Sequence, residues 1–302
     1  MRFSIWPNLA QPWTDVVDAV RHAESTGWDG VYVADHFMGD AGGFGPAETP
    51  TLEATAALAA LATATERVRL GSLVFGITYR HPAVLAKWAA TVDHASGGRL
   101  LLGVGAGWQE NEHQQYGIPL GSPGERIERF DEALQVLRGL LSEPTTTVHG
   151  RHYTVTDALA EPKPVQAALP ILVGGKGDRM LGLVARYADE WNMWSTPEQY
   201  AERSAALDAR CEQAGRDPGA IARSTQALVF LVDDATKAKE LVERVAPRPA
   251  VAGTAEAIAE QMPAYRDAGV DEFIVPDFTL GQGPRRADAL DALLGAFAPM
   301  RQ

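Results

Sequence analysis

The chain is poor in cysteine and in basic residues, and it has no long apolar run. Its single cysteine, Cys211, excludes an internal disulfide framework and suits a reducing compartment. Lysine and arginine number 27 against 39 acidic residues, and the formal net charge of −12 disfavours a nucleic-acid or anionic-membrane surface. No apolar run reaches the ~18–20 residues of a membrane-spanning helix. Residues 1–10 lack the pattern of a secretion signal, so we expect a cytoplasmic protein with no membrane partner.

Several catalytic signatures are absent as well. The chain has no Gly-x-Ser-x-Gly elbow, which weakens a hydrolase interpretation. No group of metal-ligating side chains stands at a suitable spacing, so we expect no metal. Cys211 shares the inward face of a predicted helix with Tyr200 and Leu207, and we interpret it as a core residue rather than a nucleophile.

Predicted strands alternate with predicted helices along the whole chain. The strands are Arg2–Trp6, Gly30–Ala34, Val68–Phe75, Leu100–Val104, Pro170–Val173, Glu190–Met193, Leu228–Val232 and Glu272–Val275. Eight such units in one domain over residues 1–302 predict an α/β fold, a (β/α)8 TIM barrel. A doubly wound sheet is the alternative, and the early first strand and the count of strands favour the barrel. Residues 144–165 break the rhythm and predict an inserted hairpin or lobe.

Caps and apolar spacing mark the helices. The clearest one runs from Gly124 to Leu141, with apolar residues at 3-4-3-4 spacing. Thr14 is expected to cap the first helix, and Thr196 to open another through a capping box. The helix that starts at Pro82 is expected to carry Val84, Trp88, Val92 and Ala95 along one face.

The active site of a barrel lies at the C-terminal ends of its strands. The turn Gly174-Gly175-Lys176-Gly177-Asp178-Arg179 follows a strand and opens a helix, so its backbone N–H groups could hold a phosphate. A tight turn that binds nothing is the alternative. Gly103-Val104-Gly105-Ala106-Gly107-Trp108 also follows a strand, where small residues permit either a flat ligand or close packing.

Asp35-His36 ends the second strand, where a histidine can act as an acid or a base. A structural histidine is the alternative. His81 is held extended by Pro82 and could face the pocket or bridge to the loop. His22, His94 and His113 are expected to be solvated.

The order of short motifs along the chain is distinctive. It runs Asp35-His36-Phe37, Leu70-Gly71-Ser72-Leu73-Val74, Tyr79-Arg80-His81-Pro82, Gly103 to Trp108, Ile171-Leu172-Val173-Gly174-Gly175 and Asp189-Glu190-Trp191-Asn192. This series resembles the luciferase-like monooxygenase superfamily, and most closely the branch that uses the deazaflavin coenzyme F420. Asp-His rather than Glu-His after the second strand favours that branch over the flavin branch.

The resemblance implies a TIM barrel with insertions, a flat cofactor at its C-terminal mouth, a homodimer, and a non-proline cis peptide at Leu73–Val74 that forms a bulge behind the cofactor ring. His36 would be the catalytic residue. The cofactor-binding residues would be Asp35, His36, Leu73, Val74, Gly105, Ala106, Gly107, Trp108, Gly174, Gly175, Lys176, Gly177, Asp178, Arg179 and Asn192. The substrate pocket would be formed by Phe37, Tyr79, His81, Trp108 and Trp194.

We therefore expect an oxidoreductase that transfers a hydride between F420 and a small organic substrate. The alternatives are an FMN-dependent two-component monooxygenase, a flavin- or deazaflavin-binding protein without turnover, and a phosphate-binding aldolase or isomerase barrel, for which a strand-end lysine is missing. Similar sugar-phosphate dehydrogenases carry a glutamate where Trp108 stands. Trp108 therefore implies a different substrate and a more apolar pocket.

Overall fold

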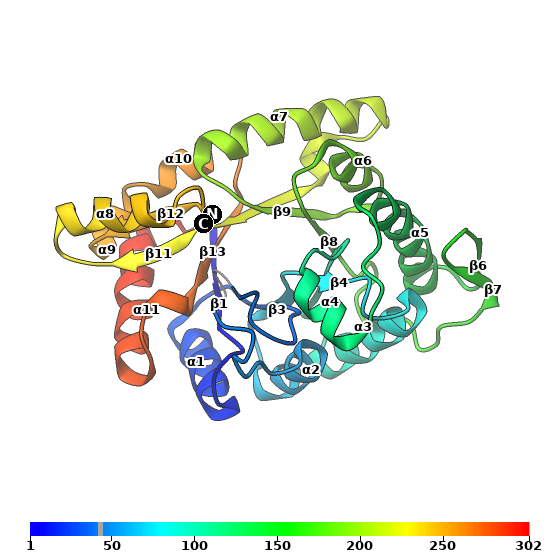
Figure 1. The fold of residues 1–302 in the computed structure, drawn as a ribbon, viewed down its shortest axis with the longest axis horizontal. Helices are drawn as coiled ribbons and strands as arrows, with labels where there is room; N and C mark the ends of the chain where they lie inside the picture. The colour runs from blue at the N-terminus through cyan, green and yellow to red at the C-terminus, as the bar shows by residue number, and fades with distance from the viewer. Residues whose placement is uncertain (42–44, 302) are drawn as a thin grey trace.

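The strands of the chain close into a parallel barrel. A computed structural model describes residues 1–41 and 45–301. Within them the main sheet contains, in spatial order, β3 (Arg69–Ser72), β2 (Gly30–Val33), β1 (Arg2–Trp6), β13 (Glu272–Pro276), β10 (Ala222–Gln226), β9 (Glu190–Trp194), β8 (Ile171–Gly174), β5 (Leu100–Gly105) and β4 (Phe75–Gly76). Because β3 also pairs with β5, the sheet closes on itself. The predicted (β/α)8 barrel is confirmed (Figure 1).

β3 and β4 share one position in the barrel and are separated by a bulge. Both pair with β5, through Gly71 opposite Leu101 and Phe75 opposite Val104. Three residues separate Gly71 from Phe75, whereas two separate Leu101 from Val104, so one extra residue is accommodated here. The Leu73–Val74 peptide bond within the bulge is cis, as the family resemblance implies.

Helices cover the outside of the barrel (Figure 1). They are α1 (Trp13–Thr26), α2 (Ala54–Ala64), α3 (Pro82–Ser96), α4 (Glu110–Tyr116), α5 (Pro123–Ser142), α6 (Asp178–Tyr187), α7 (Pro197–Gln213), α8 (Ala235–Val245), α9 (Ala255–Ala259), α10 (Met262–Asp267) and α11 (Gly283–Phe297), with short 3-10 turns η1 (Pro218–Ala220), η2 (Asp277–Thr279) and η3 (Ala298–Met300). Across the described part of the chain, no helix combines the length and the apolar character needed to cross a membrane.

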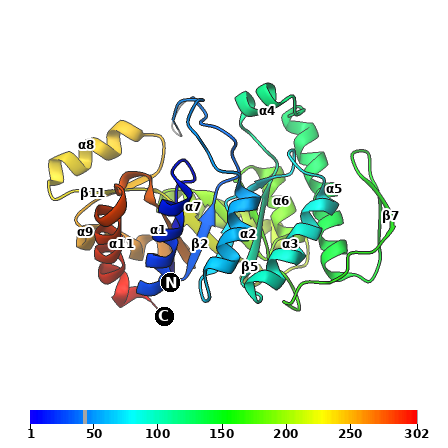
Figure 2. The same cartoon turned by 90° about the horizontal axis from the view of Figure 1, so that it is seen from below.

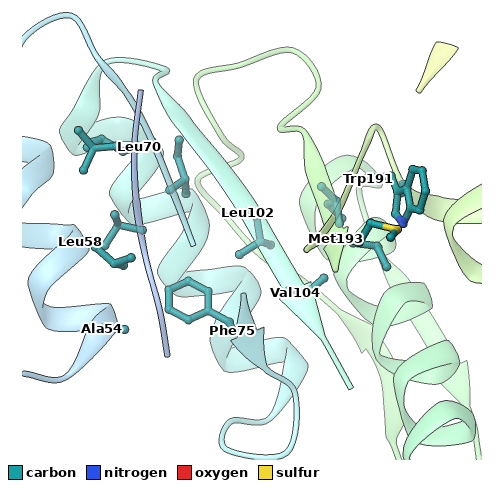
Figure 3. Close-up of a cluster of buried hydrophobic side chains, with 14 of the residues drawn as sticks. Ala54, Leu58, Leu70, Phe75, Leu102, Val104, Trp191 and Met193 are labelled. Atoms are coloured by element: carbon teal, nitrogen blue, oxygen red, sulfur yellow. The ribbon is translucent and has the colours of Figure 1, made fainter. Parts of the chain in front are cut away.

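The main core lies between the barrel and its helices. Along β5, Leu102 and Val104 belong to this outer core, whereas Leu101 belongs to a smaller cluster inside the barrel. This alternation follows from the two-residue period of a strand. Figure 3 shows Ala54 and Leu58 of α2 on the same outer side as Leu102. Inward-facing positions at the strand ends are therefore left to form the mouth of the barrel.

One predicted barrel strand is wrong. The seventh strand is expected at Leu228–Val232, but β10 (Ala222–Gln226) takes that position. β11 (Leu228–Leu231) instead pairs in parallel with β12 (Ala250–Gly253) in a separate two-stranded sheet. The reason is polarity: β10 places Ser224 and Gln226 inside the barrel, where both accept hydrogen bonds from Asn192. A strand with polar inward residues lacks the apolar pattern used to predict strands. The apolar segment that follows it, β11, matches that pattern better and was predicted instead.

The hairpin predicted within 144–165 is present, with β6 (Thr146–His149) antiparallel to β7 (Thr154–Ala158). It projects on the side of the barrel opposite to α8 (Figure 2). Residues 42–44, in a glycine-rich stretch of the sequence, lie outside the described residues.

Two predictions about helix residues fail in whole or in part. Of the face predicted for α3, Val92 is buried and Trp88 packs against the core, but Val84 is 63% exposed; Leu85, Ala86 and Ala89 are buried as well. Alanines provide the close-packed face of this helix, and they carry little weight in an apolar pattern. Thr14 does not cap α1, because that helix already begins at Trp13 after Pro12.

Candidate active site

A cavity of about 460 Å³ opens at the C-terminal ends of the barrel strands. Its volume falls in the range of small-molecule and cofactor sites. It is lined by Asp35, His36, Leu73, Val74, Gly76, Tyr79, Gly105, Ala106, Gly107, Trp108, Gly174, Gly175, Lys176, Met180, Asn192, Met193, Trp194 and Gln226. The barrel thus brings together the turns after five different strands, as the rule for barrel active sites requires. We call this space the glycine-floored cavity.

The floor of this cavity is formed by Val74, which packs between glycines of two neighbouring strands. A Cβ built on Gly105 would lie 2.6 Å from Val74 Cγ2, and one built on Gly174 would lie 3.0 Å from Val74 Cγ1. The first distance is impossible and the second is tight, so the bulge and the two glycines require one another. These three residues form an apolar part of the cavity lining.

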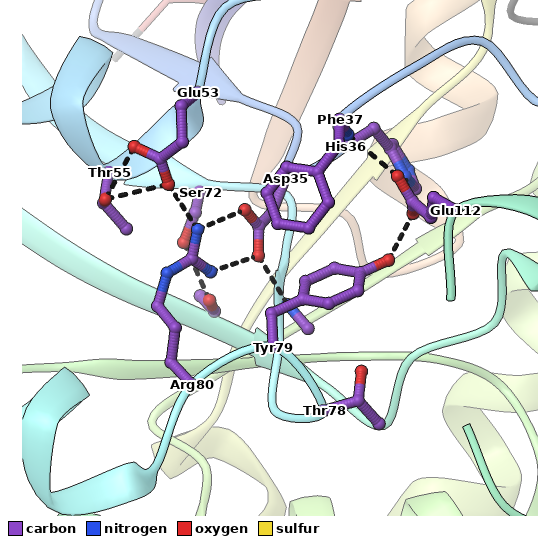
Figure 4. A network of polar contacts seen from close by, with 12 residues as sticks. Asp35, His36, Phe37, Glu53, Thr55, Ser72, Thr78, Tyr79, Arg80 and Glu112 are labelled. Atoms are coloured by element: carbon purple, nitrogen blue, oxygen red, sulfur yellow. Dashed lines mark hydrogen bonds and ion pairs between the residues drawn. The ribbon is translucent and has the colours of Figure 1, made fainter. Parts of the chain in front are cut away.

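Asp35 is buried at the end of β2 and is bound by Arg80. The guanidinium donates to both carboxylate oxygens at 2.6 and 2.9 Å, and the N–H of Gly76 donates to Oδ2 at 2.9 Å. Burial raises the pKa of Asp35, although Arg80 opposes this effect. Arg80 also contacts Glu53, the N-cap of α2 (Figure 4). The carboxylate therefore anchors the start of β4, and its oxygens are engaged by protein donors.

His36 follows Asp35, and its ring lines the cavity. Nδ1 lies 2.8 Å from Oε1 of Glu112, and the N–H of Phe37 donates to Oε2 of the same carboxylate at 2.8 Å. The hydroxyl of Tyr79 donates to Oε1 as well (Figure 4). Burial favours the neutral form of Glu112, but the hydrogen bonds from His36, Tyr79 and Phe37 outweigh it and lower the pKa. An ionised Glu112 therefore fixes the position of the His36 ring.

Tyr79 is the second partner of Glu112. Burial and the adjacent carboxylate raise the pKa of Tyr79 well above its ordinary value, so its hydroxyl keeps its proton. The ring of Tyr79 lies 4.7 Å from the ring of His113.

Glu112 lies on α4, a short helix that the sequence analysis does not predict. A signal was available at the end of the helix: Gly117 follows the polar stretch after Trp108, and it caps the helix in the left-handed region with φ of 66°. The prediction that His113 is solvated is wrong. It is 2% exposed and bonds to the carbonyl of Gln109 at 2.6 Å and to Thr78 Oγ1 at 2.7 Å, because α4 folds back over the loop after β4.

Trp108 lies at the rim of the cavity. Its side chain is 53% exposed, and its ring stands edge-on to His36 with 5.4 Å between the ring centres. Tyr79 and Trp194, which the resemblance assigns to the substrate pocket, also line the cavity.

Phe37 and His81 do not line the cavity, and their predicted place in the substrate pocket is corrected. Phe37 points away from His36 and packs on Tyr79 and Tyr116. His81 caps α3 by accepting from the N–H of Ala83, because Pro82 starts that helix at the outer surface.

The turn after β8 is tied to β9. Gly175 donates through its N–H to the carbonyl of Asn192, and the indole N–H of Trp191 donates to the carbonyl of Gly175 at 2.7 Å. Gly174, Gly175 and Lys176 line the cavity, whereas Gly177, Asp178 and Arg179 lie just outside the lining. α6 begins after Gly177 without a side-chain cap, so no side chain occupies the first-turn N–H groups there. An anion at this end of α6 would meet those N–H groups and Lys176.

Asn192 and Gln226 form the polar wall of the cavity. The side-chain N–H₂ of Asn192 donates to Ser224 Oγ at 2.9 Å and to Gln226 Oε1 at 2.8 Å. Gln226 is a second residue that the sequence analysis misses, because the seventh barrel strand was predicted at Leu228–Val232, after Gln226. Both amides are held by the barrel rather than by a mobile loop.

The comparison with protein families identifies this architecture. Residues 1–249 match the luciferase-like monooxygenase family, and the chain belongs to that family. An uncharacterized protein of Mycobacterium tuberculosis is 34% identical over 186 residues, which cover 57% of this chain and 65% of that protein. Pyrimidine monooxygenase RutA of Escherichia coli is 32% identical over 200 residues, which cover 62% of this chain and 53% of RutA. The chain thus spans between half and two thirds of the length of these relatives.

Solved structures match the fold over the whole chain. An F420-dependent secondary alcohol dehydrogenase in complex with an F420–acetone adduct has a TM-score of 0.85 at 21% identity, covering 100% of this chain and 99% of that one. The coenzyme F420 dependent tetrahydromethanopterin reductase from Methanopyrus kandleri has a TM-score of 0.82 at 17% identity, with the same coverage of 100% and 99%. At these identities the similarity shows the fold alone.

Proposed function

We propose that the protein is an oxidoreductase that transfers a hydride between coenzyme F420 and a small organic substrate at the barrel mouth. One observation carries the proposal: His36, fixed by the Glu112 carboxylate, lines a cavity with a narrow glycine floor and room for a flat cofactor. The F420-dependent enzymes with the same fold support it.

The residues of the cavity fit a deazaflavin cofactor. Val74, Gly105 and Gly174 would hold the flat ring, since no side chain projects from either glycine. Lys176 and the uncapped first turn of α6 would hold the phosphate. When bound, the cofactor supplies or accepts the hydride, while the protein supplies position and proton transfer.

At Nε2, His36 would give the substrate a proton as the imidazolium when hydride is delivered to the substrate, and would take one as the neutral ring when hydride leaves it. The ionised Glu112 accepts the Nδ1–H of His36, which fixes the tautomer and assigns proton exchange to Nε2. Tyr79 keeps its proton and holds the carboxylate from the other side. Trp108, edge-on to His36, would place an apolar ring beside the reacting region.

A flavin-dependent monooxygenase is the second candidate. The 32% identity with RutA, a pyrimidine monooxygenase, favours it, and so does the shared fold of a riboflavin lyase solved with modified FMN. The same floor and the same phosphate turn would accept FMN. The Asp35-His36 pair after β2 favours F420.

Titration of the purified protein with F420 and, separately, with FMN distinguishes the two candidates, and cofactor fluorescence reports the binding. We expect saturable binding of F420 and none of FMN over the same concentration range. Tight binding of FMN without binding of F420 would replace the first candidate with the second. If neither cofactor binds, both candidates fall.

A further inference from the structure

Two neighbouring side-chain amides line the glycine-floored cavity, Asn192 on β9 and Gln226 on β10. Only 3% of Asn192 and 2% of Gln226 is exposed, and the two residues project from adjacent parallel strands. Ile274, which pairs with Gln226 on the other side, belongs to the apolar cluster inside the barrel. Polar atoms buried in such a place destabilise the fold unless each of them finds a hydrogen-bond partner.

One half of each amide is bound by the protein. Asn192 Nδ2 donates to Ser224 Oγ at 2.9 Å and to Gln226 Oε1 at 2.8 Å. The hydroxyl of Ser224 donates to the carbonyl of Trp191 at 3.4 Å, so its oxygen serves as the acceptor for Asn192. This series of contacts identifies the nitrogen of Asn192 and the oxygen of Gln226 as the bound ends of the two amides.

The other half of each amide has no protein partner. Within residues 1–41 and 45–301, Asn192 Oδ1 and Gln226 Nε2 take part in no hydrogen bond, and neither is among the unpartnered atoms that the protein encloses completely. Because both residues line the cavity and are otherwise buried, the small exposed part of each lies at the cavity. The pair thus presents one acceptor and one donor, next to each other, to a ligand.

The other side-chain oxygens of the cavity lining are engaged. Both carboxylate oxygens of Asp35 accept from protein donors, and the hydroxyl of Tyr79 is bound to Glu112. Among the described lining residues, Asn192 Oδ1 is the one side-chain oxygen that takes part in no hydrogen bond. A neutral ligand N–H in this cavity therefore finds its acceptor at Asn192, with the donor Gln226 Nε2 beside it.

An adjacent acceptor and donor are complementary to a ring edge that carries an N–H next to a carbonyl. Side-chain amides recognise the edge of a nucleobase by the same principle, through one acceptor and one donor. The ring systems of F420 and FMN both end in a pyrimidinedione, whose edge consists of an N–H between two carbonyls. Both amides are uncharged, so they recognise this edge by its pattern of hydrogen bonds and not by charge.

We propose that Asn192 and Gln226 bind the pyrimidinedione edge of the cofactor ring. Asn192 Oδ1 would accept from the ring N–H, and Gln226 Nε2 would donate to the neighbouring carbonyl. This edge would then lie toward β9 and β10, which fixes how the ring is turned within its plane. The inference rests on the proposed function for the presence of a flavin-like ring, but not for the choice between F420 and FMN.

Ring compounds without a phosphate test the edge directly. Lumiflavin and 5-deazalumiflavin carry the ring alone, and the 3-methyl derivative of each lacks the N–H. Fluorescence titration of the full chain should show that methylation weakens binding about 10- to 100-fold, because Asn192 Oδ1 loses its partner and stays unsatisfied. Equal affinity for the parent and methylated rings would overturn the proposal.

Two variants separate the two hydrogen bonds. Asn192→Leu should abolish the preference for the parent ring over the methylated one. Gln226→Met should weaken the binding of both rings about tenfold and retain the preference. Gln213→Met is the matched control, because this exposed glutamine at the end of α7 lies outside the cavity, and circular dichroism checks that each variant is folded.

The same variants are titrated with F420 and with FMN, which covers the case that the ring alone binds too weakly to be measured. Gln226→Met should weaken the binding of whichever cofactor the wild type takes about tenfold, and Gln213→Met should not. Unchanged cofactor affinity in a folded Gln226→Met variant would overturn the proposal.

A substrate could carry the same N–H and carbonyl edge, and 2-pyridone tests that source. In the chain saturated with cofactor, 2-pyridone should bind no more tightly than 1-methyl-2-pyridone, since the cofactor ring occupies the amides. A preference for 2-pyridone, with none for the unmethylated flavin ring, would assign the pair to the substrate and overturn the proposal. If the wild type prefers unmethylated lumiflavin but binds no F420, the amide pair stands and F420 is the wrong cofactor. If F420 binds and methylation of the ring has no effect, the proposed function stands and the amide pair fails.

Discussion

Both ends of the barrel bury carboxylates, but the two ends use them differently. At the N-terminal ends of the strands, Glu190 and Glu272 are bound by two arginines, with 2.6 Å between Arg69 and Glu190 and 3.0 Å between Arg2 and Glu272. Tyr32 adds a hydrogen bond to Glu272 at 3.0 Å. Every partner in this network is another strand residue, and the network closes the bottom of the barrel.

At the C-terminal mouth, two consecutive residues show the contrast within one segment. Asp35 is bound by Arg80 and the backbone, like the carboxylates at the bottom. His36 is bound by Glu112 on one side and lines open cavities on the other. Both residues line the cavity, but the two carboxylate oxygens of Asp35 are bound by Arg80 and Gly76, whereas the Glu112 carboxylate orients the ring of His36.

Of the substitutions that test this contrast, His36→Ala should have the largest effect, and the effect is on turnover. Loss of the proton-transferring ring should lower turnover about 10²–10⁴-fold, while F420 affinity stays nearly unchanged. Turnover is measured as the oxidation of reduced F420, with any substrate that the wild-type enzyme reduces. His81→Ala is the control, since that residue lies outside the cavity and should have no effect. Lost F420 affinity with normal turnover would contradict the role given to His36.

Glu272→Ala should have the opposite signature. It leaves Arg2, Arg69 and Tyr32 without their shared acceptor, so the free energy of unfolding should fall by about 3 kcal/mol, the low end for a broken buried pair because both arginines are partly exposed. Urea denaturation followed by circular dichroism measures this loss. Glu66→Ala, at an exposed position, should change stability little. If Glu272→Ala is as stable as the wild type but binds F420 more weakly, the N-terminal network serves the site rather than stability, and the distinction drawn here is wrong.

Glu112→Gln should fall between these two extremes. An amide cannot act as the charged acceptor for His36, and a hydrogen bond to a charged group contributes about 1.5–3 kcal/mol, so turnover should fall roughly 10- to 100-fold. Because Glu112 acts through His36, the expected loss is in kcat with KM unchanged. Glu110→Gln, on the exposed face of the same helix, provides the matched control. A change confined to KM would show that Glu112 only shapes the pocket.

The smallest effect concerns acid stability. The pKa of Glu112 is lowered below its ordinary value of 4.5, so the folded chain binds this proton less tightly than the unfolded chain does. The ionised carboxylate therefore stabilises the fold above the unfolded pKa, and this contribution is lost as the pH falls through the folded pKa. Stability measured between about pH 3 and pH 6 should decline less steeply in Glu112→Gln than in the wild type. Parallel curves would indicate that Glu112 gains nothing from its ionised form.

The fold could be predicted largely because strands and helices leave local signals. The apolar strands and the capping box at Thr196 are confirmed close to their predicted places. The barrel strand β10 was not found, because its inward side chains are Ser224 and Gln226, which carry no apolar pattern. The cis peptide at Leu73–Val74 came from the family resemblance, since nothing in the composition of the strand requires it.

The site was harder to predict, because its key contacts are far apart in the sequence. His36 and Glu112 are separated by 76 positions, and no short-range pattern pairs them. Arg80 joins Asp35 from 45 positions away. His36 and the glycine turns were found because they stand at strand ends. Glu112 was missed because α4 is short and polar, and its place beside His36 follows only from the fold of the segment after β5 over the mouth.

The carboxylate of Glu112 has one further consequence, because it holds His36 at two points. Oε1 binds the ring, and Oε2 binds the N–H of the next residue, Phe37. The ring and its backbone therefore lose their conformational freedom together when the chain folds. A ligand that arrives at the mouth meets a histidine that is already ordered, so none of its binding free energy is consumed in arresting that side chain.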